Sequence, residues 1–95
     1  MSTEHFLKTL LPYFDAVERG EKNFEVRRDD RGYQKGDILV LRCWNDKTLG
    51  WVYDGSRLGS PIKEMRKRII YILTGGQFGI EPGFVVMGLE DEERR

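Results

Sequence analysis

The most informative stretch of this sequence is Gly20-Glu21-Lys22-Asn23-Phe24-Glu25-Val26-Arg27. It leads from a predicted helix end into a short predicted strand with alternating apolar and charged residues. Successive side chains of a strand point to opposite faces, so Phe24 and Val26 share one face while Glu25 and Arg27 share the other. We expect the apolar pair to pack into a core. The charged pair would then lie side by side within reach of Lys22, which predicts a polar site.

Three blocks of sequence, the one above and two further ones, point to a known family. The pattern G-x-K-x-x-E-x-R at residues 20–27 is typical of ASCH domains, a branch of the PUA-like β-barrels, and the chain resembles them also at 33–39 and 71–87. The last block is similar to an ASCH-like subfamily, common in phages and bacteria, that is a domain of unknown function. The resemblance covers residues 5–89. It implies an α+β fold, a small PUA-like mixed β-barrel of about five strands with one or two short helices.

Length and charge limit the possible functions. A chain of 95 residues is expected to form a single domain, here with an ordered core at about 5–89 and a charged tail at 90–95. Its 16 basic and 16 acidic residues give zero formal net charge. This balance argues against a protein that coats nucleic acid by bulk charge, so any anion site must be local.

Cysteine and histidine are scarce. Cys43 is the single cysteine, and the sequence shows no signal peptide or long apolar run, so we expect a cytoplasmic protein without contact to a membrane. His5 and Cys43 supply at most two of the roughly four ligands that a zinc site needs, so we expect no metal and no cofactor. A serine triad is not predicted, because Ser56 and Ser60 lie in a variable segment and no acid is placed to orient His5.

Turn residues and apolar patterns predict the order of the elements. A helix is expected from Pro12 to a C-terminal cap at Gly20, with Tyr13, Phe14 and Val17 on one apolar stripe. The segment 45–61 is interpreted as a long loop or a small hairpin. The predicted strands are His5–Leu10, Asn23–Arg28, Ile38–Trp44, Met65–Leu73 and Phe84–Leu89.

Two other stretches each allow two interpretations. The basic run from Arg57 to Arg68 is either a basic patch or a solvated edge strand protected by its charges. The glycine-rich loop at 75–79 is either a phosphate cradle or a tight connection between two strands. In that loop, Gln77 could read a base edge, and Phe78 could stack on a base or fill the core.

The resemblance implies a binding module as the leading function. ASCH domains carry the motif in a cleft, which here would be a cationic cleft for RNA or a nucleotide-like ligand. In this hypothesis Arg27 grips a phosphate, Lys22 is a movable point charge, and Glu25 orients Arg27 or accepts from a base amino group. Gln77 and Phe78 would cap the cleft.

Two other functions remain open from the sequence. Some small ASCH proteins hydrolyse an acylated cytidine-type nucleoside, and the resemblance would make Lys22, Glu25 and Glu81 the catalytic residues here. The chain departs from that pattern, because Glu25 stands where those amidohydrolases carry threonine. The third possibility is a phage or bacterial accessory protein that binds another protein through residues 51–59. The oligomeric state is also open.

Overall fold

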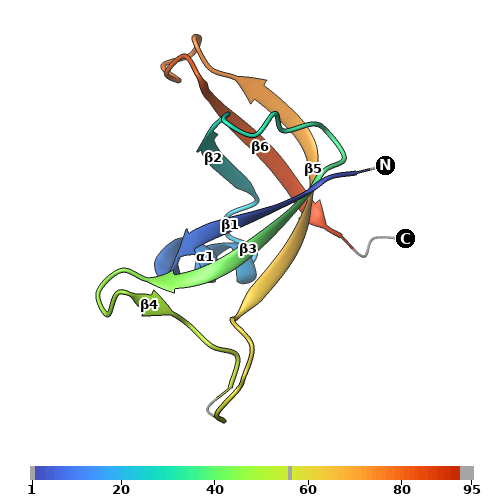
Figure 1. Ribbon diagram of the computed structural model, residues 1–95. Helices are drawn as coiled ribbons and strands as arrows, with labels where there is room; N and C mark the ends of the chain where they lie inside the picture. Colours follow the sequence, from blue (N-terminus) through green and yellow to red (C-terminus); the bar gives the residue numbers. More distant parts are fainter. Residues whose placement is uncertain (1, 56, 93–95) are drawn as a thin grey trace.

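A computed structural model describes residues 2–55 and 57–92, which form six strands and one helix. All six strands belong to one sheet with the order β1-β3-β5-β6-β2, and β4 pairs with β3 outside this path. Figure 1 shows this sheet curled into a half barrel. The small strand-rich fold agrees with the predicted fold class at this level. The elements are β1 (Glu4–Leu10), α1 (Leu11–Glu18), β2 (Phe24–Arg28), β3 (Ile38–Asn45), β4 (Gly50–Trp51), β5 (Glu64–Thr74) and β6 (Phe84–Asp91).

Strand β3 forms the centre of the core. Its apolar run predicts a strand covered on both faces, and the four residues Ile38, Leu39, Val40 and Leu41 are all buried. The strand pairs in parallel with β1 and antiparallel with β5. Cys43 on the same strand is also buried, and burial raises the pKa of its thiol. It therefore behaves as a small apolar side chain.

Helix α1 follows β1 without a loop. Leu10 is extended and Pro12 lies in the first turn, where its fixed φ suits a helix start. Phe14 and Val17 are buried in the core cluster, so the helix covers that side of β1 and β3. Gly20 adopts φ +83°, which glycine tolerates without strain, and its N–H donates to the carbonyl of Val17. This turn directs the chain towards β2.

The half barrel is linked across its open side by two arginine side chains. Strands β1 and β2 are the two ends of the sheet order. Arg27 Nη2 donates to the carbonyl oxygen of Lys8 at 3.2 Å, and Arg31 Nη1 donates to that of Phe6 at 3.0 Å. We call this region, where β2 faces β1, the seam. The backbone groups of an edge strand need partners, and here guanidinium groups provide some of them.

The segment 45–61 forms a small extension of the sheet. Trp51 of β4 pairs with Trp44 of β3, and Tyr53 forms an isolated bridge with Ile62. Leu58 near its tip is fully exposed. In Figure 1 the segment projects away from the half barrel. Of the two interpretations from sequence, the structure therefore confirms the small hairpin.

Strand β5 lies inside the sheet, between β3 and β6, so the interpretation of its basic residues as an edge strand is wrong. These side chains are paired with acids. Arg66 contacts Glu4 and Glu92, while Lys67 contacts Asp91. The basic residues of β5 are thus largely neutralised by nearby acids, so this part of the run does not form an open basic patch.

Strand β6 continues two residues beyond its predicted end at Leu89. Glu90 and Asp91 pair with Arg68 and Lys67 of β5 in the sheet register. Opposite charges on neighbouring strands stabilise this extension. The ordered core was predicted to end at about residue 89, but residues 90 and 91 of the predicted charged tail belong to β6, and residues 93–95 lie outside the described residues. In the described part of the chain, no helix is long and apolar enough to cross a membrane.

Candidate functional site

Strand β2 turns its charged side chains inward and its apolar side chains outward. Glu25 is only 3 % exposed, whereas Phe24 and Val26 are 40 % and 50 % exposed. The expectation that Phe24 and Val26 pack into the core is therefore wrong. The physical reason is the position of β2 at the end of the sheet, where its inner face meets the seam and Arg27 bonds to β1.

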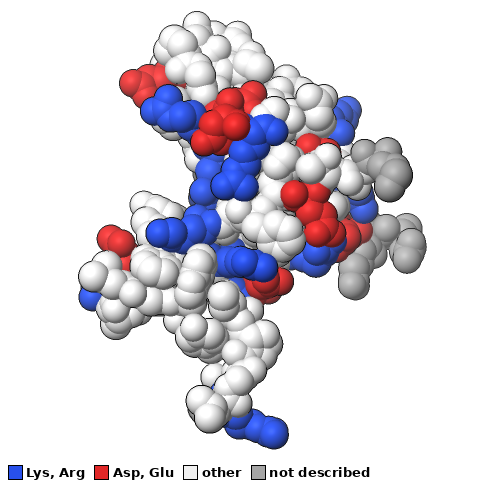
Figure 2. Space-filling view, in the orientation of Figure 1, with Lys and Arg blue, Asp and Glu red and all other residues white. Residues whose placement is uncertain are grey.

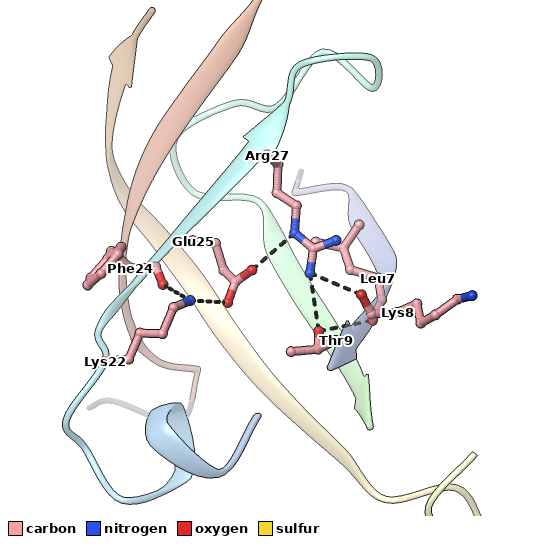
Figure 3. Close-up of polar contacts among 7 residues, drawn as sticks. All are labelled: Leu7, Lys8, Thr9, Lys22, Phe24, Glu25 and Arg27. Carbon is pink, nitrogen blue, oxygen red and sulfur yellow. Dashed lines mark hydrogen bonds and ion pairs between the residues drawn. The ribbon is translucent and has the colours of Figure 1, made fainter. Parts of the chain in front are cut away.

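Glu25 is held by one cation on each side. Lys22 Nζ donates to Glu25 Oε2 at 2.7 Å and also to the carbonyl oxygen of Phe24 at 2.7 Å. Arg27 Nε donates to Glu25 Oε1 at 3.0 Å, as Figure 3 shows. A buried carboxylate is tolerated when it is paired and hydrogen-bonded, and both oxygens of Glu25 meet this condition. The structure thus brings the three ionic side chains of the motif together.

Arg27 is also fixed to β1 from across the seam. Its Nη2 donates to the Thr9 hydroxyl at 3.3 Å as well as to the carbonyl of Lys8. The Thr9 hydroxyl in turn donates to the carbonyl of Leu7 at 3.3 Å. These bonds hold the planar guanidinium in one orientation. In the described part of the chain, no residue accepts a hydrogen bond from Nη1, which leaves that nitrogen for a ligand.

A pocket of about 360 Å³ lies beside this charged cluster. Its volume is within the range of small-molecule sites, roughly 300–1,000 Å³. The side chains of Lys22 and Arg27 keep 18 % and 26 % of their surface exposed, so a ligand can reach both cations. The lining residues come from β1, α1, the following turn and β2: Lys8, Thr9, Leu10, Tyr13, Lys22, Glu25, Val26 and Arg27.

Tyr13 gives the pocket an exposed aromatic ring. The Lys22 ammonium lies 6.0 Å from the centroid of the Tyr13 ring and 4.9 Å from that of Phe24. An ammonium near an aromatic face is held by the ring quadrupole, which favours this position of Lys22. Tyr13 was expected on the apolar stripe with Phe14. It is more than half exposed because it lies about 100° around the helix from that buried residue.

Lys22, Glu25 and Arg27 together carry an excess of one positive charge, and Lys8, which also lines the pocket, adds a second. Lys22 and Arg27 face a single carboxylate, Glu25, whereas the Lys8 ammonium lies 4.3 Å over the ring of Trp44. Figure 2 shows a band of basic side chains over the area where β2 and β1 lie in Figure 1, with acidic side chains beside it. The local charge suits an anionic ligand although the chain is neutral.

The structure does not bring Gln77, Phe78 or Glu81 to this pocket. All three lie in the connection between β5 and β6, next to Phe84, which pairs with Arg28 at the far end of β2. Gln77 donates to the carbonyl of Thr74, and the Phe78 ring is exposed. The set Lys22, Glu25 and Glu81 is therefore not assembled at one site.

The glycine-rich loop has the geometry of a tight connection. The N–H of Gly75 donates to the carbonyl of Phe84, and the N–H of Gly76 donates to that of Ile80. A side chain at Gly75 would lie 2.0 Å from the carbonyl oxygen of Glu81, so the chain approaches too closely for any residue but glycine. Because these amides are used within the loop, they are not directed at a ligand.

A second polar cluster lies at the start of β1. His5 Nε2 is 2.9 Å from Asp37 Oδ2, and the His5 ring contacts the ring of Tyr33 at 4.8 Å between centroids. Sequence reasoning found no acid to orient His5. Asp37 is that acid, brought beside it by the parallel pairing of β1 with β3.

Asp37 is stabilised as a carboxylate. Burial opposes its ionisation, but hydrogen bonds from His5 and from the N–H groups of Thr3 and Gln34 outweigh this and lower its pKa. Burial raises the pKa of the neighbouring Tyr33. Among the described residues, no group of three or more His, Cys, Asp or Glu side chains could hold a metal ion.

Sequence reasoning missed the part of the pocket that comes from β1 and α1. Thr9, Leu10 and Tyr13 precede the motif, and nothing in residues 20–27 indicates that Arg27 reaches across the seam to them. The available signal was the direct junction of β1 and α1 at Leu11-Pro12. This junction places one face of the helix start beside the end of the strand.

Comparisons with known proteins identify a family without a described activity. The family model described as "Domain of unknown function (DUF3850)" matches residues 4–89. An "Uncharacterized 12.9 kDa protein in GpA 3'region" from Escherichia phage P2 is 43% identical over 65 residues, which are 68% of this chain. The match spans 56% of that relative's own length. The family match covers all the residues that line the pocket, and neither description names a ligand.

Proposed function

This chain belongs to the DUF3850 family, and we propose that it is a PUA-like ASCH module whose cationic pocket binds RNA or a nucleotide-type ligand. The observation that carries the proposal is the pocket of about 360 Å³ bordered by Lys22 and Arg27 around the buried Glu25. The curled half barrel and the motif at residues 20–27 support the assignment to the ASCH domains. The phage relative is consistent with it but says nothing of a ligand.

Each polar group has a distinct part in the proposed binding. Arg27 Nη1 and the Lys22 ammonium contact a phosphate, since charge-assisted bonds to phosphate are among the stronger hydrogen bonds in proteins. Glu25 keeps both cations in place before the ligand arrives, which lowers the entropy lost on binding. The excess of one positive charge on Lys22, Glu25 and Arg27 suits a single phosphate group better than a long run of backbone.

Tyr13 supplies the stacking surface for a base. Its ring is exposed at the pocket, near the ammonium of Lys22. Stacking of a base on an aromatic side chain contributes about 1–3 kcal/mol by alanine substitution. Phosphate contact and stacking together require one nucleotide unit, either free or within a single strand.

A titration with fluorescently labelled single-stranded RNA, with nucleoside monophosphates as competitors, tests this proposal. We expect saturable binding at low salt, with a shallow slope of log affinity against log salt of about −0.7, since a single phosphate is neutralised. Arg27→Ala and Tyr13→Ala should each weaken binding at least about tenfold, in line with a lost charged bond or a lost stack.

Arg31→Ala is the matched control. Arg31 also bonds a β1 carbonyl across the seam, but it does not line the pocket. This variant should bind like the wild type. No saturable binding by any RNA or nucleotide at low salt, or equal losses in Arg31→Ala and Arg27→Ala, would contradict the proposal.

A further inference from the structure

The outer face of the half barrel carries a continuous apolar patch across three strands. In the sheet register, Phe24 lies beside Gly88 and Tyr71, and Val26 lies beside Val86 and Leu73. Figure 3 shows the Phe24 ring pointing away from Glu25 and Arg27. We call the apolar side chains on this outer face the outer patch. They are Phe24 and Val26 of β2, Phe84 and Val86 of β6, and Ile70, Tyr71 and Leu73 of β5.

The outer patch is unusual for a sheet face in contact with water. An antiparallel sheet that is covered on one side normally carries polar residues on the other. Here Val26 and Tyr71 are 50 % and 61 % exposed, and Phe24 and Ile70 are also exposed. A contiguous exposed apolar area of this kind marks an interaction surface. We infer that the outer patch is the interface of a symmetric homodimer in which two copies pack face to face.

The patch is complementary to itself in shape. Gly88 has no side chain, and a Cβ at this position would lie 3.7 Å from Ile70 and Tyr71, which is ordinary contact, so the outer face has room for a small apolar group there. Val86 lies two residues away on the same strand and projects to the same side. Consider a two-fold axis that lies in the plane of the interface, passes over Met87 and runs perpendicular to β6. Such an axis places Val86 of each copy over Gly88 of the other. Such an interface is isologous, which is the usual form of a homodimer contact.

The charges at the two ends of the patch fit the same arrangement. Arg28 lies over the Phe84 ring at 4.7 Å, and no carboxylate within residues 2–55 and 57–92 forms an ion pair with it. Glu90, six residues from Phe84 along β6 and so about 20 Å away, has only a loose 3.8 Å contact with Arg68. The two-fold axis exchanges these ends and brings Arg28 of one copy towards Glu90 of the other.

A second copy fits the patch better than a nucleic acid does. The cations over its rings are Arg28 at Phe84 and Lys22 at Phe24, about 14 Å apart along β2, whereas phosphate binding depends on several Lys and Arg contacts close together. The zero net charge of the chain means that two copies do not repel each other. The ionic side chains of the pocket on β2, Glu25 and Arg27, lie on the opposite face of that strand, and of the lining residues only Val26 also belongs to the outer patch.

Sedimentation of the full chain over a wide range of concentration, up to about 1 mM, tests the inference. We expect a reversible monomer–dimer equilibrium for the wild type. Val26→Glu buries an unpaired charge in the interface and should weaken dimerisation by about 100-fold or more. Leu58→Glu is the control, because Leu58 is even more exposed but lies on the projecting 45–61 segment, and its dissociation constant should not change.

A charge exchange keeps the test independent of any folding defect in Val26→Glu. Arg28→Glu alone should weaken dimerisation about tenfold, and the double variant Arg28→Glu with Glu90→Arg should restore it, because the pair is rebuilt with reversed signs. A wild type that stays monomeric throughout, a dimer unaffected by Val26→Glu, or a double variant no better than Arg28→Glu would overturn the inference.

Discussion

Two polar clusters lie at opposite ends of β1, and they differ in how far water can reach them. At the start of the strand, His5 and Asp37 have side chains that are 7 % and 6 % exposed. At its end, Glu25 is equally buried, but its partners Lys22 and Arg27 keep about a fifth to a quarter of their side-chain surface in contact with solvent. Both clusters satisfy a buried carboxylate, yet only the second leaves cations available to a ligand.

The difference separates a structural cluster from a candidate site. Asp37 accepts bonds from the N–H groups of Thr3 and Gln34, so it ties the start of the chain to the turn before β3. Glu25 instead accepts bonds from side chains that border a pocket. We therefore expect substitutions at the first cluster to reduce stability, and substitutions at the second to affect ligand binding more than stability.

The largest effect on stability should come from Asp37→Ala. It leaves the N–H groups of Thr3 and Gln34 and the ring of His5 without their partner, which should cost about 3 kcal/mol of unfolding free energy. Urea denaturation measures this loss. Glu21→Ala is the control, because it removes only an exposed ion pair with Arg19 and should leave the unfolding free energy almost unchanged. A comparable small loss in Asp37→Ala would show that the first cluster is not structural.

A smaller loss, about 2 kcal/mol, is expected for Glu25→Ala. The variant leaves Lys22 and Arg27 without their carboxylate, but both cations can turn partly towards water, which limits the cost. Glu64→Ala, which breaks the more exposed pair with Arg42, is the control and should cost less than about 1 kcal/mol. Equal losses at Glu25 and Asp37 would remove the distinction between the two clusters.

Titration of Asp37 should change stability less than its deletion does. Its pKa is lowered from the ordinary value of 3.8 in the folded chain, so the unfolded chain binds a proton first as the pH falls. The stabilisation from Asp37 is thus complete at pH values above the ordinary pKa of 3.8, and it is lost as the pH falls through the lower pKa of the folded chain. Thermal melts of the wild type between neutral and acidic pH measure this loss. In Asp37→Asn the dependence should be weaker, and an unchanged dependence would assign it to other carboxyl groups.

The smallest effect on stability is expected for Lys22→Ala. Its removal leaves Oε2 of the buried Glu25 without a donor while Arg27 still pairs with Oε1, so the loss should be about 1 kcal/mol. Binding of RNA or nucleotide by the same variant should fall at least about tenfold, because a direct phosphate contact is removed. A larger effect on unfolding than on binding would place Lys22 with the structural cluster.

The sequence was sufficient to predict the elements but not their orientation. The apolar run of β3 and the Pro12 and Gly20 signals of α1 predicted these elements because they depend on local preferences. Alternation in β2 correctly grouped Glu25 with Arg27, but it could not decide which face is buried. That choice depends on the position of β2 at the end of the sheet, which is a property of the whole topology.

The same limit applies to the candidate site. Local reasoning found Lys22, Glu25 and Arg27, because they lie within a few residues of one another. Thr9 and Tyr13 reach the pocket only because β1 and β2 face each other across the seam, and Asp37 reaches His5 only through strand pairing. Contacts between distant parts of the chain leave no local pattern in a single sequence.

We propose that a nucleotide binds in the pocket bordered by Lys22 and Arg27 and at no other part of the described surface. Nuclear magnetic resonance of the isotope-labelled full chain, titrated with a nucleoside monophosphate and with a short single-stranded RNA, tests this location residue by residue. We expect the largest saturable shifts on the backbone amides of Thr9, Tyr13, Lys22 and Glu25, while those of residues 75–80 stay unchanged. Saturable shifts confined to the 75–80 loop or to the outer patch, or no shifts at low salt, would contradict it.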